Sequence, residues 1–172
     1  EVIIPGYGYL AAANIALQMG LKPIFADVDL ETFCITSKNI EKKITSKTKL
    51  IVVSNTYGNV CDFDSIIKIG KINKIPILED AAESFGSLYK KKQSGTLGDI
   101  GTYSFQATKT ITTGEGGMIV TRMDKHFIKK LKLYRNHGVK DKRYYHYLPG
   151  GNFRLTNIQA AIGCAQLKKI AT

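Results

Sequence analysis

The chain has 172 residues, 44% of them hydrophobic and 23% charged, and its formal net charge is +11. This composition is typical of a globular domain with a sizeable core, and it argues against a disordered chain or a coiled coil. No apolar run approaches the roughly 18 residues that cross a bilayer, and the opening residues lack a signal-peptide pattern, so we expect a cytoplasmic protein without a membrane partner.

Short runs of β-forming residues alternate with segments of helical periodicity along the chain. We expect strands at Val2–Ile4, Pro23–Phe25, Leu50–Val53, Ile75–Leu78, Gly101–Phe105 and Met118–Thr121. We expect helices at Ala11–Met19, Ser37–Ile44, Phe63–Asn73, Phe127–Arg135 and Asn157–Ile170. Strands that alternate with helices pair in parallel through helical crossovers. The sequence therefore predicts an α/β fold with a mainly parallel, mixed sheet.

The cysteines and the positive charge suggest no special chemistry. Cys34, Cys61 and Cys164 lie far apart and lack CxxC or Cys/His spacing, so we expect packed thiols, with no disulfide and no metal site. The lysines are spread over helix-like stretches and are not interleaved with stacking aromatics. A solvated surface that attracts phosphate-bearing ligands is therefore favoured over a nucleic-acid partner, although a basic nucleic-acid-binding domain stays open as an alternative.

The turn after the first expected strand fits a dinucleotide-binding pattern. Gly6, Gly8 and Ala11 match G-x-G-x-x-A between a strand and a helix, and Asp27 or Asp29 follows at about the distance of a ribose-binding acid. The tyrosines and the leucine between these positions crowd a turn through which the backbone must approach a pyrophosphate. This turn can therefore be interpreted in two ways: as part of a nicotinamide-dependent oxidoreductase, or as a turn that only connects a strand to a helix.

A second group of residues matches the needs of a Schiff-base cofactor site. Asp80 ends an apolar strand, where open α/β sheets place ligand-binding groups, although an Asp there can also cap a helix. Lys109 follows another strand and offers an amine. A pyridoxal phosphate site needs that amine, an acid for the pyridine nitrogen, a phosphate donor such as Ser104 and a flat ring such as Tyr9.

The sequence EDAAESFGSLYKKKQSGTLGDIGTYSFQATKTITTGEGGMIVT at 79–121 strongly resembles the cofactor core of the DegT/DnrJ/EryC1/StrS sugar aminotransferases. The resemblance extends to PGYGYLAAANIALQMGLKPIFADVD at 5–29, YRNHG at 134–138 and GNFRLTNIQAAIGCAQL at 151–167. It implies the three-layer α/β/α large domain of a fold type I pyridoxal-phosphate enzyme over residues 1–172. We expect the chain to be an internal fragment, with the family's glycine-threonine phosphate loop before residue 1 and the small domain after residue 172.

The resemblance also implies roles for individual residues. Lys109 forms the Schiff base, Asp80 binds the pyridine nitrogen, Ser104 binds the cofactor phosphate and Tyr9 stacks on the ring. Asn152 is expected to reach the phosphate in the neighbouring subunit, which implies a homodimer with shared sites.

Two further positions have open roles. Glu83 stands where the family often has glutamine, and it must be protonated to donate a hydrogen bond to the cofactor phenolate. Arg154 is a candidate clamp for a carboxylate or diphosphate of the substrate, or a surface arginine that pairs with acids.

Lysine at 109 favours transamination over dehydration, because the dehydratase branch of the family has histidine at the Schiff-base position. The runs EDAAESFGS, KTITTGEGGM and RYYHYLPGGNFRLTNIQAAIG look most like perosamine synthases, which aminate C4 of GDP-linked 4-keto-6-deoxymannose. The expected function is thus amino transfer, with L-glutamate as donor, to a nucleotide-linked keto sugar. A pyridoxal-phosphate-dependent sugar dehydratase remains an alternative.

Overall fold

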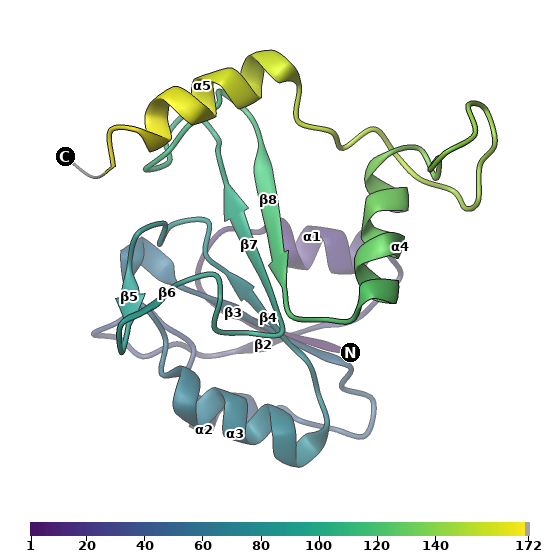
Figure 1. The fold of residues 1–172 in the computed structure, drawn as a ribbon. Coiled ribbons are helices and arrows are strands. Elements are labelled where there is room, and N and C mark those ends of the chain that lie inside the picture. The colour runs from purple at the N-terminus through teal and green to yellow at the C-terminus, as the bar shows by residue number, and fades with distance from the viewer. Residues whose placement is uncertain (171–172) are drawn as a thin grey trace.

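The computed structural model describes residues 1–170, which form one six-stranded sheet with helices on both faces (Figure 1). The sheet strands are β1 (Val2–Pro5), β2 (Pro23–Ala26), β3 (Leu50–Ser54), β4 (Ile77–Asp80), β7 (Ile100–Ser104) and β8 (Gly117–Thr121). Their order is β2-β1-β3-β4-β7-β8, and every neighbouring pair is parallel except β7 and β8, which are antiparallel. The expectation of a mainly parallel, mixed α/β sheet is confirmed.

The remaining elements surround this sheet. The helices are α1 (Ala11–Gln18), α2 (Ser37–Glu41), α3 (Phe63–Asn73), α4 (Lys125–Arg135) and α5 (Asn157–Leu167), with a short 3₁₀ turn, η1 (Thr56–Gly58). A small hairpin, β5 (Leu88–Tyr89) and β6 (Lys92–Gln93), forms a second sheet. Among the described residues, no helix is long and apolar enough to cross a membrane.

Alternating side chains of the central strands supply two separate cores. Ile3 of β1 and Ile51 of β3 pack with Phe63 and Ile66 of α3 and with α2 on one face. The neighbouring residues of the same strands, including Val2 and Val52, pack with α1 on the other face. This alternation follows from the two-residue period of a strand, and it produces the three layers seen in Figure 1.

Several expected boundaries move in the structure, and local backbone contacts explain the clearest of them. The helix expected to start at Ser37 ends at Glu41 rather than Ile44, and the strand expected at Ile75 starts at Ile77. Lys74 takes a left-handed conformation with φ 54° at the end of α3, and the Ile75 N–H bonds back to Gly70. Ile75 therefore belongs to a helix C-terminal turn and not to β4.

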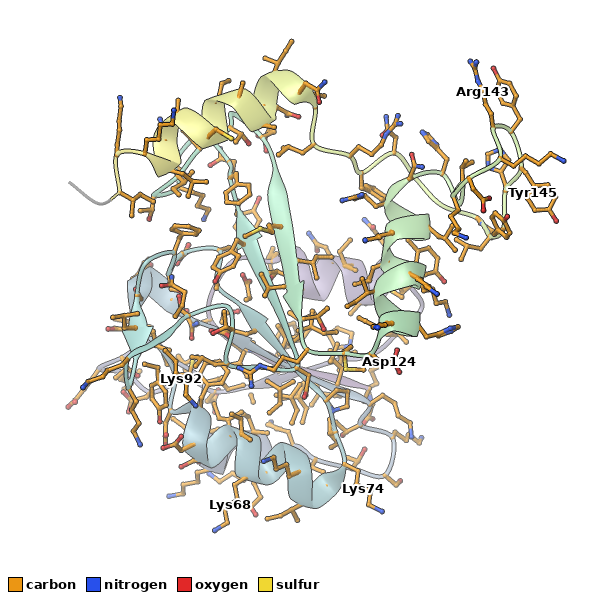
Figure 2. All side chains as sticks on the ribbon, viewed as in Figure 1. Lys68, Lys74, Lys92, Asp124, Arg143 and Tyr145 are labelled. Carbon is orange, nitrogen blue, oxygen red and sulfur yellow. The ribbon has the colours of Figure 1, made fainter. Side chains whose placement is uncertain are left out.

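The side-chain distribution confirms one surface expectation and corrects another. Lys68 and Lys74 point away from the sheet, as expected for a solvated face (Figure 2). Cys34 and Cys61 are buried and unbridged, whereas Cys164 on α5 is exposed, so the expectation that all three thiols are packed was wrong for Cys164. Polar and apolar residues are not clearly separated on the two sides of α5, so its sequence does not indicate which side packs against the protein.

Candidate active site

The carboxyl ends of the parallel strands bring the two predicted site residues Asp80 and Ser104, together with Ser54, to one edge of the sheet. Ser54 ends β3, Asp80 ends β4 and Ser104 ends β7, and these strands are adjacent. In the strand register Ser54 lies opposite Asp80, and Asp80 lies opposite Thr102. Open α/β sheets bind ligands at this edge, so the topology itself creates the candidate site.

The Asp80 carboxylate is half-buried and only lightly bound by the protein. One oxygen accepts the Ala82 N–H at 3.0 Å, and the other accepts the Ser54 hydroxyl at a long 3.5 Å. Burial raises the pKa of Asp80 above its ordinary value, and the Ala82 N–H only partly opposes this rise. A cation placed against this carboxylate would offset the loss of solvation, which suits a protonated pyridine nitrogen.

Lys109 lies in the loop that leaves β7 and returns as β8. Its N–H bonds to Gln106, and its ammonium lies 3.8 Å from the Glu83 carboxylate. Among the causes that act on the pKa of Asp80, the charge of Glu83 raises it and the charge of Lys109 lowers it. The structure thus brings Asp80, Glu83 and Lys109 into one electrostatic group.

Ser104 begins the loop that carries Lys109. Its hydroxyl accepts the Gln106 N–H at 3.3 Å, and the Phe105 N–H bonds to Gly116 at 2.8 Å, which closes the loop onto the start of β8. Within residues 1–170 the Ser104 hydroxyl acts only as an acceptor, so its own proton is available to donate. A phosphate oxygen is a suitable acceptor for it.

Tyr9 is in the turn before α1, and the residue is 87% exposed. The preceding tyrosine behaves differently, because Tyr7 packs against Phe33 and Tyr57 in an aromatic cluster with ring-centre distances of 5.3 to 6.3 Å. The Tyr7 and Tyr57 hydroxyls share a hydrogen bond of 2.6 Å. This cluster could not be predicted from the sequence, because its members come from three different connecting segments.

Asn152 and Arg154 are not in the group formed by Asp80, Glu83 and Lys109. Both are exposed and lie in the arm, residues 136–155, which links α4 to α5 and projects from the sheet (Figure 1). Asn152 pairs with Asn136 in an isolated β-bridge and accepts a hydrogen bond of 2.9 Å from Arg154 Nε. Figure 2 places Arg143 and Tyr145 at the far end of the arm.

Glu79, beside Asp80, has a role that the sequence analysis missed. It is fully buried, and its carboxylate accepts the Asn55 amide at 2.8 Å and the backbone N–H groups of Gly95, Leu97 and Gly98 at 2.6 to 3.3 Å. Four donors compensate the buried charge and fix the loop before β7. The available signal was the strand period, which turns Glu79 to the face opposite Asp80.

The side chains at this edge fit pyridoxal phosphate in chemical type. An amine, a half-buried acid with spare acceptor capacity and a free hydroxyl donor are what its aldehyde, pyridine nitrogen and phosphate require. No group of three or more His, Cys, Asp or Glu residues in the described part of the chain has the arrangement of a metal site.

Sequence comparison relates the full length of the chain to one enzyme family. The model of the DegT/DnrJ/EryC1/StrS aminotransferase family matches residues 1–172. The chain is 46% identical over 170 residues to GDP-perosamine synthase of Escherichia coli O157:H7, covering 98% of this chain and 46% of that protein. It is 43% identical over 171 residues to the GDP-perosamine synthase of Caulobacter vibrioides, covering 99% and 46%.

Other relatives carry other names. A UDP-2-acetamido-2-deoxy-3-oxo-D-glucuronate aminotransferase of Pseudomonas aeruginosa is 39% identical over 163 residues, covering 94% of this chain and 45% of that protein. The chain spans about half the length of the curated relatives it matches, as the coverage of 46% for the Escherichia coli protein shows. Its residues therefore correspond to one part of those proteins.

Solved structures give the same answer for the fold. PseC of Helicobacter pylori, an aminotransferase of pseudoaminic acid biosynthesis, superposes with a TM-score of 0.92 at 36% identity, covering 98% of this chain and 46% of that chain. An AHBA synthase gives 0.94 at 31% identity, covering 99% and 45%. A candidate sugar aminotransferase of Streptococcus pneumoniae, in its PLP form, gives 0.90 at 29% identity, covering 99% and 49%.

Proposed function

This chain belongs to the DegT/DnrJ/EryC1/StrS aminotransferase family, and from this we propose that its full-length protein transfers an amino group to a nucleotide-linked keto sugar. The observation that carries the proposal is the grouping of Asp80, Glu83 and Lys109 at the carboxyl edge of the sheet. We propose that residues 1–172 form part of the cofactor-binding large domain, with the phosphate loop and the small domain contributed by other segments.

The cofactor of this family is pyridoxal phosphate, and one matched structure is described as a PLP form and another as a PMP form. When bound, it supplies an electron sink that makes the α-proton of an amino donor removable. In our proposal the Asp80 carboxylate keeps the proton on the pyridine nitrogen, the Ser104 hydroxyl donates to the phosphate, and the Tyr9 ring covers one face of the cofactor. Glu83 lies beside the amine of Lys109.

Lys109 has two roles in this proposal. Its Nζ holds the cofactor covalently, and once released it moves the proton between the donor carbon and the cofactor. A general base must be neutral at that moment and must lie within hydrogen-bond reach of the proton. Lys109 lies five residues past Ser104, the last residue of β7, in the loop that returns as β8, and its Nζ faces Glu83 at 3.8 Å.

For the substrate we propose GDP-4-keto-6-deoxymannose, with L-glutamate as the amino donor and GDP-perosamine as the product. The support is the identity of 46%, 43% and 39% to three perosamine synthases, while a relative that is named for a different sugar is 39% identical. The test is to incubate the full-length protein with L-glutamate and either GDP-linked or UDP-linked keto sugars. Conversion of the GDP sugar to a 4-amino product by mass and NMR is expected, and conversion of only UDP sugars would contradict the substrate assignment.

Two alternatives are weaker. Dehydration is chemically close, and a GDP-4-keto-6-deoxymannose-3-dehydratase superposes with a TM-score of 0.91 at 33% identity, so the fold alone does not separate the two reactions. The amine of Lys109 favours transamination, because the dehydratase branch that this sequence resembles has histidine at the corresponding position. The nicotinamide hypothesis loses its support, because the family match extends over the turn with Gly6 and Gly8 and the Tyr7 ring belongs to the aromatic cluster.

We further propose a homodimer whose subunits share their sites. Asn152 would bind the cofactor phosphate of the neighbouring subunit, and Arg154 would bind an anionic group of the substrate there. The support is that both residues are exposed on a projecting arm (Figure 1). We also propose a cytoplasmic location, which suits the unbridged thiols of Cys34 and Cys61.

A further inference from the structure

A turn at the end of β3 connects an aromatic cluster to the proposed cofactor lysine. Tyr57 has φ 55° and ψ 25°, which is the left-handed region that side chains with a Cβ rarely adopt. In this conformation its backbone N–H donates to Glu83 Oε2 at 2.9 Å. Residues held in such a conformation concentrate at functional sites, where the surrounding structure must fix them.

Contacts within the aromatic cluster of Tyr7, Phe33 and Tyr57 stabilise the left-handed conformation of Tyr57. The Tyr57 hydroxyl bonds to the Tyr7 hydroxyl at 2.6 Å, and the Tyr57 ring lies edge-on to Tyr7 and Phe33 at 6.3 and 5.9 Å between ring centres. Phe33 itself is left-handed, with φ 56°. Two of the three cluster residues therefore have a conformation that needs support, and each supports the other through ring contact.

Glu83 links this turn to Lys109. While Oε2 accepts the Tyr57 N–H, Oε1 lies 3.8 Å from Lys109 Nζ, and the two side chains are 37% and 23% exposed. We propose that Tyr57 is a positioning residue that acts through Glu83 to hold the Lys109 amine, in its charged form, in the cofactor-free protein. This inference rests on the proposed function, because it assigns Lys109 to the cofactor.

Capture of the cofactor requires the Lys109 amine to be neutral. The Lys109 ammonium, 3.8 Å from the Glu83 carboxylate, would first lose one proton to solvent. Its neutral Nζ would then be able to form a C=N bond with the aldehyde of pyridoxal phosphate, with the aldehyde oxygen leaving as water. Asp80 is a further charged group near the pair: burial raises its pKa, the charge of Glu83 also raises it, and the charge of Lys109 lowers it. The pKa of the Tyr57 phenol is raised mainly by its hydrogen bond with Tyr7, and the charge of Glu83 adds to the rise. A glutamine at position 83 would keep the Tyr57 hydrogen bond but would not hold the ammonium by charge.

The test measures how fast the full-length, cofactor-free protein captures pyridoxal phosphate across a range of pH. Schiff-base formation is followed by visible absorbance, and melting temperatures check that each variant is folded. In Glu83→Gln the pH of half-maximal capture is expected to fall by about half a pH unit, the size typical of a partly exposed ion pair. The Tyr57 hydrogen bond should persist in this variant, because the glutamine amide keeps an acceptor oxygen for the Tyr57 N–H.

Two replacements of Tyr57 separate its backbone from its ring. Tyr57→Val disfavours the left-handed conformation and should lower the half-maximal pH as much as Glu83→Gln does. Tyr57→Gly removes the ring but adopts the left-handed conformation freely, so the half-maximal pH should stay near that of the unchanged protein. In the double variant Glu83→Gln with Tyr57→Val, the shift should be no larger than with Glu83→Gln alone, because both act through one contact.

The outcomes distinguish this inference from the proposed function. A merely structural role of Tyr57 would change melting temperatures while leaving the half-maximal pH in place. If the unchanged protein captures the cofactor on Lys109 but Glu83→Gln leaves the pH profile unmoved, or if the Tyr57→Val shift adds to that of Glu83→Gln, the inference is wrong and the proposed function stands. If no Schiff base forms on Lys109 at all, both are wrong.

Discussion

Glu79 and Asp80 are consecutive residues of β4 whose carboxylates have opposite surroundings. The Glu79 carboxylate is fully buried and accepts four N–H donors, whereas Asp80 ends the strand at the site edge with one short hydrogen bond from a backbone N–H. The strand period sends the two side chains to opposite faces. One acid therefore holds the loop before β7, and the other is available to a ligand.

Replacing Asp80 by Asn should abolish function while stabilising the cofactor-free protein. Asn keeps the shape and the acceptor for Ala82 but cannot keep a proton on a pyridine nitrogen, so we expect kcat to fall at least about 100-fold. The matched measurement is the turnover of the unchanged and variant full-length proteins at saturating cofactor. Activity within about twofold of the unchanged protein would contradict the role of Asp80.

The stability effect of the same change depends on pH in a defined direction. Because burial raises the pKa of Asp80, folding disfavours its ionised form, and the stability of the unchanged protein falls as pH rises through that titration. The advantage of Asp80→Asn in melting temperature should be greatest near neutral pH. It should vanish as the pH falls below about 3.8, the ordinary pKa, because the carboxyl is then mostly protonated in both the folded and the unfolded state. Asp27→Asn, at an exposed site, is the control. An advantage independent of pH would show that desolvation is not its cause.

Glu79→Gln should destabilise the fold without changing any group that contacts the cofactor. The amide nitrogen of Gln would face N–H donors that now have a carboxylate oxygen, so we expect a loss of about 3 kcal/mol in the free energy of unfolding. Denaturant titration of the cofactor-free protein measures it, with Glu31→Gln at an exposed position as the matched control. Equal midpoints for the two variants would contradict the account of the buried network.

Mixing two inactive variants tests the proposed shared sites. Lys109→Ala removes the amine of a site, and Asn152→Ala removes the proposed phosphate contact to the partner's site. In a hybrid dimer one of the two sites then contains the unchanged Lys109 and the unchanged Asn152, and the other site contains both substitutions. After random exchange of equal amounts of the two variants, about a quarter of the sites should be intact, since half of the dimers are hybrids with one intact site each. No recovery of activity, with exchange verified, would mean that the subunits do not share sites in this way.

The sequence predicted those parts of the molecule that depend on local pattern. Alternating apolar runs identified the strands, and a parallel sheet necessarily brings Asp80 and Ser104 to the same edge. The roles of Glu79 and Tyr57 could not be predicted, because their hydrogen-bond partners lie 16 to 50 residues away in the chain and meet only in the folded protein. The hairpin of β5 and β6 was missed since strands of two residues leave no periodic signal.

The most direct measurement of the central claim is the position of the covalent cofactor. The full-length protein is incubated with pyridoxal phosphate, its visible spectrum is recorded, and borohydride reduction is followed by peptide mapping. The account predicts one reduced pyridoxyl adduct, on Lys109, and its loss together with the visible band in Lys109→Ala. An adduct on another lysine, or a band that persists in Lys109→Ala, would contradict it.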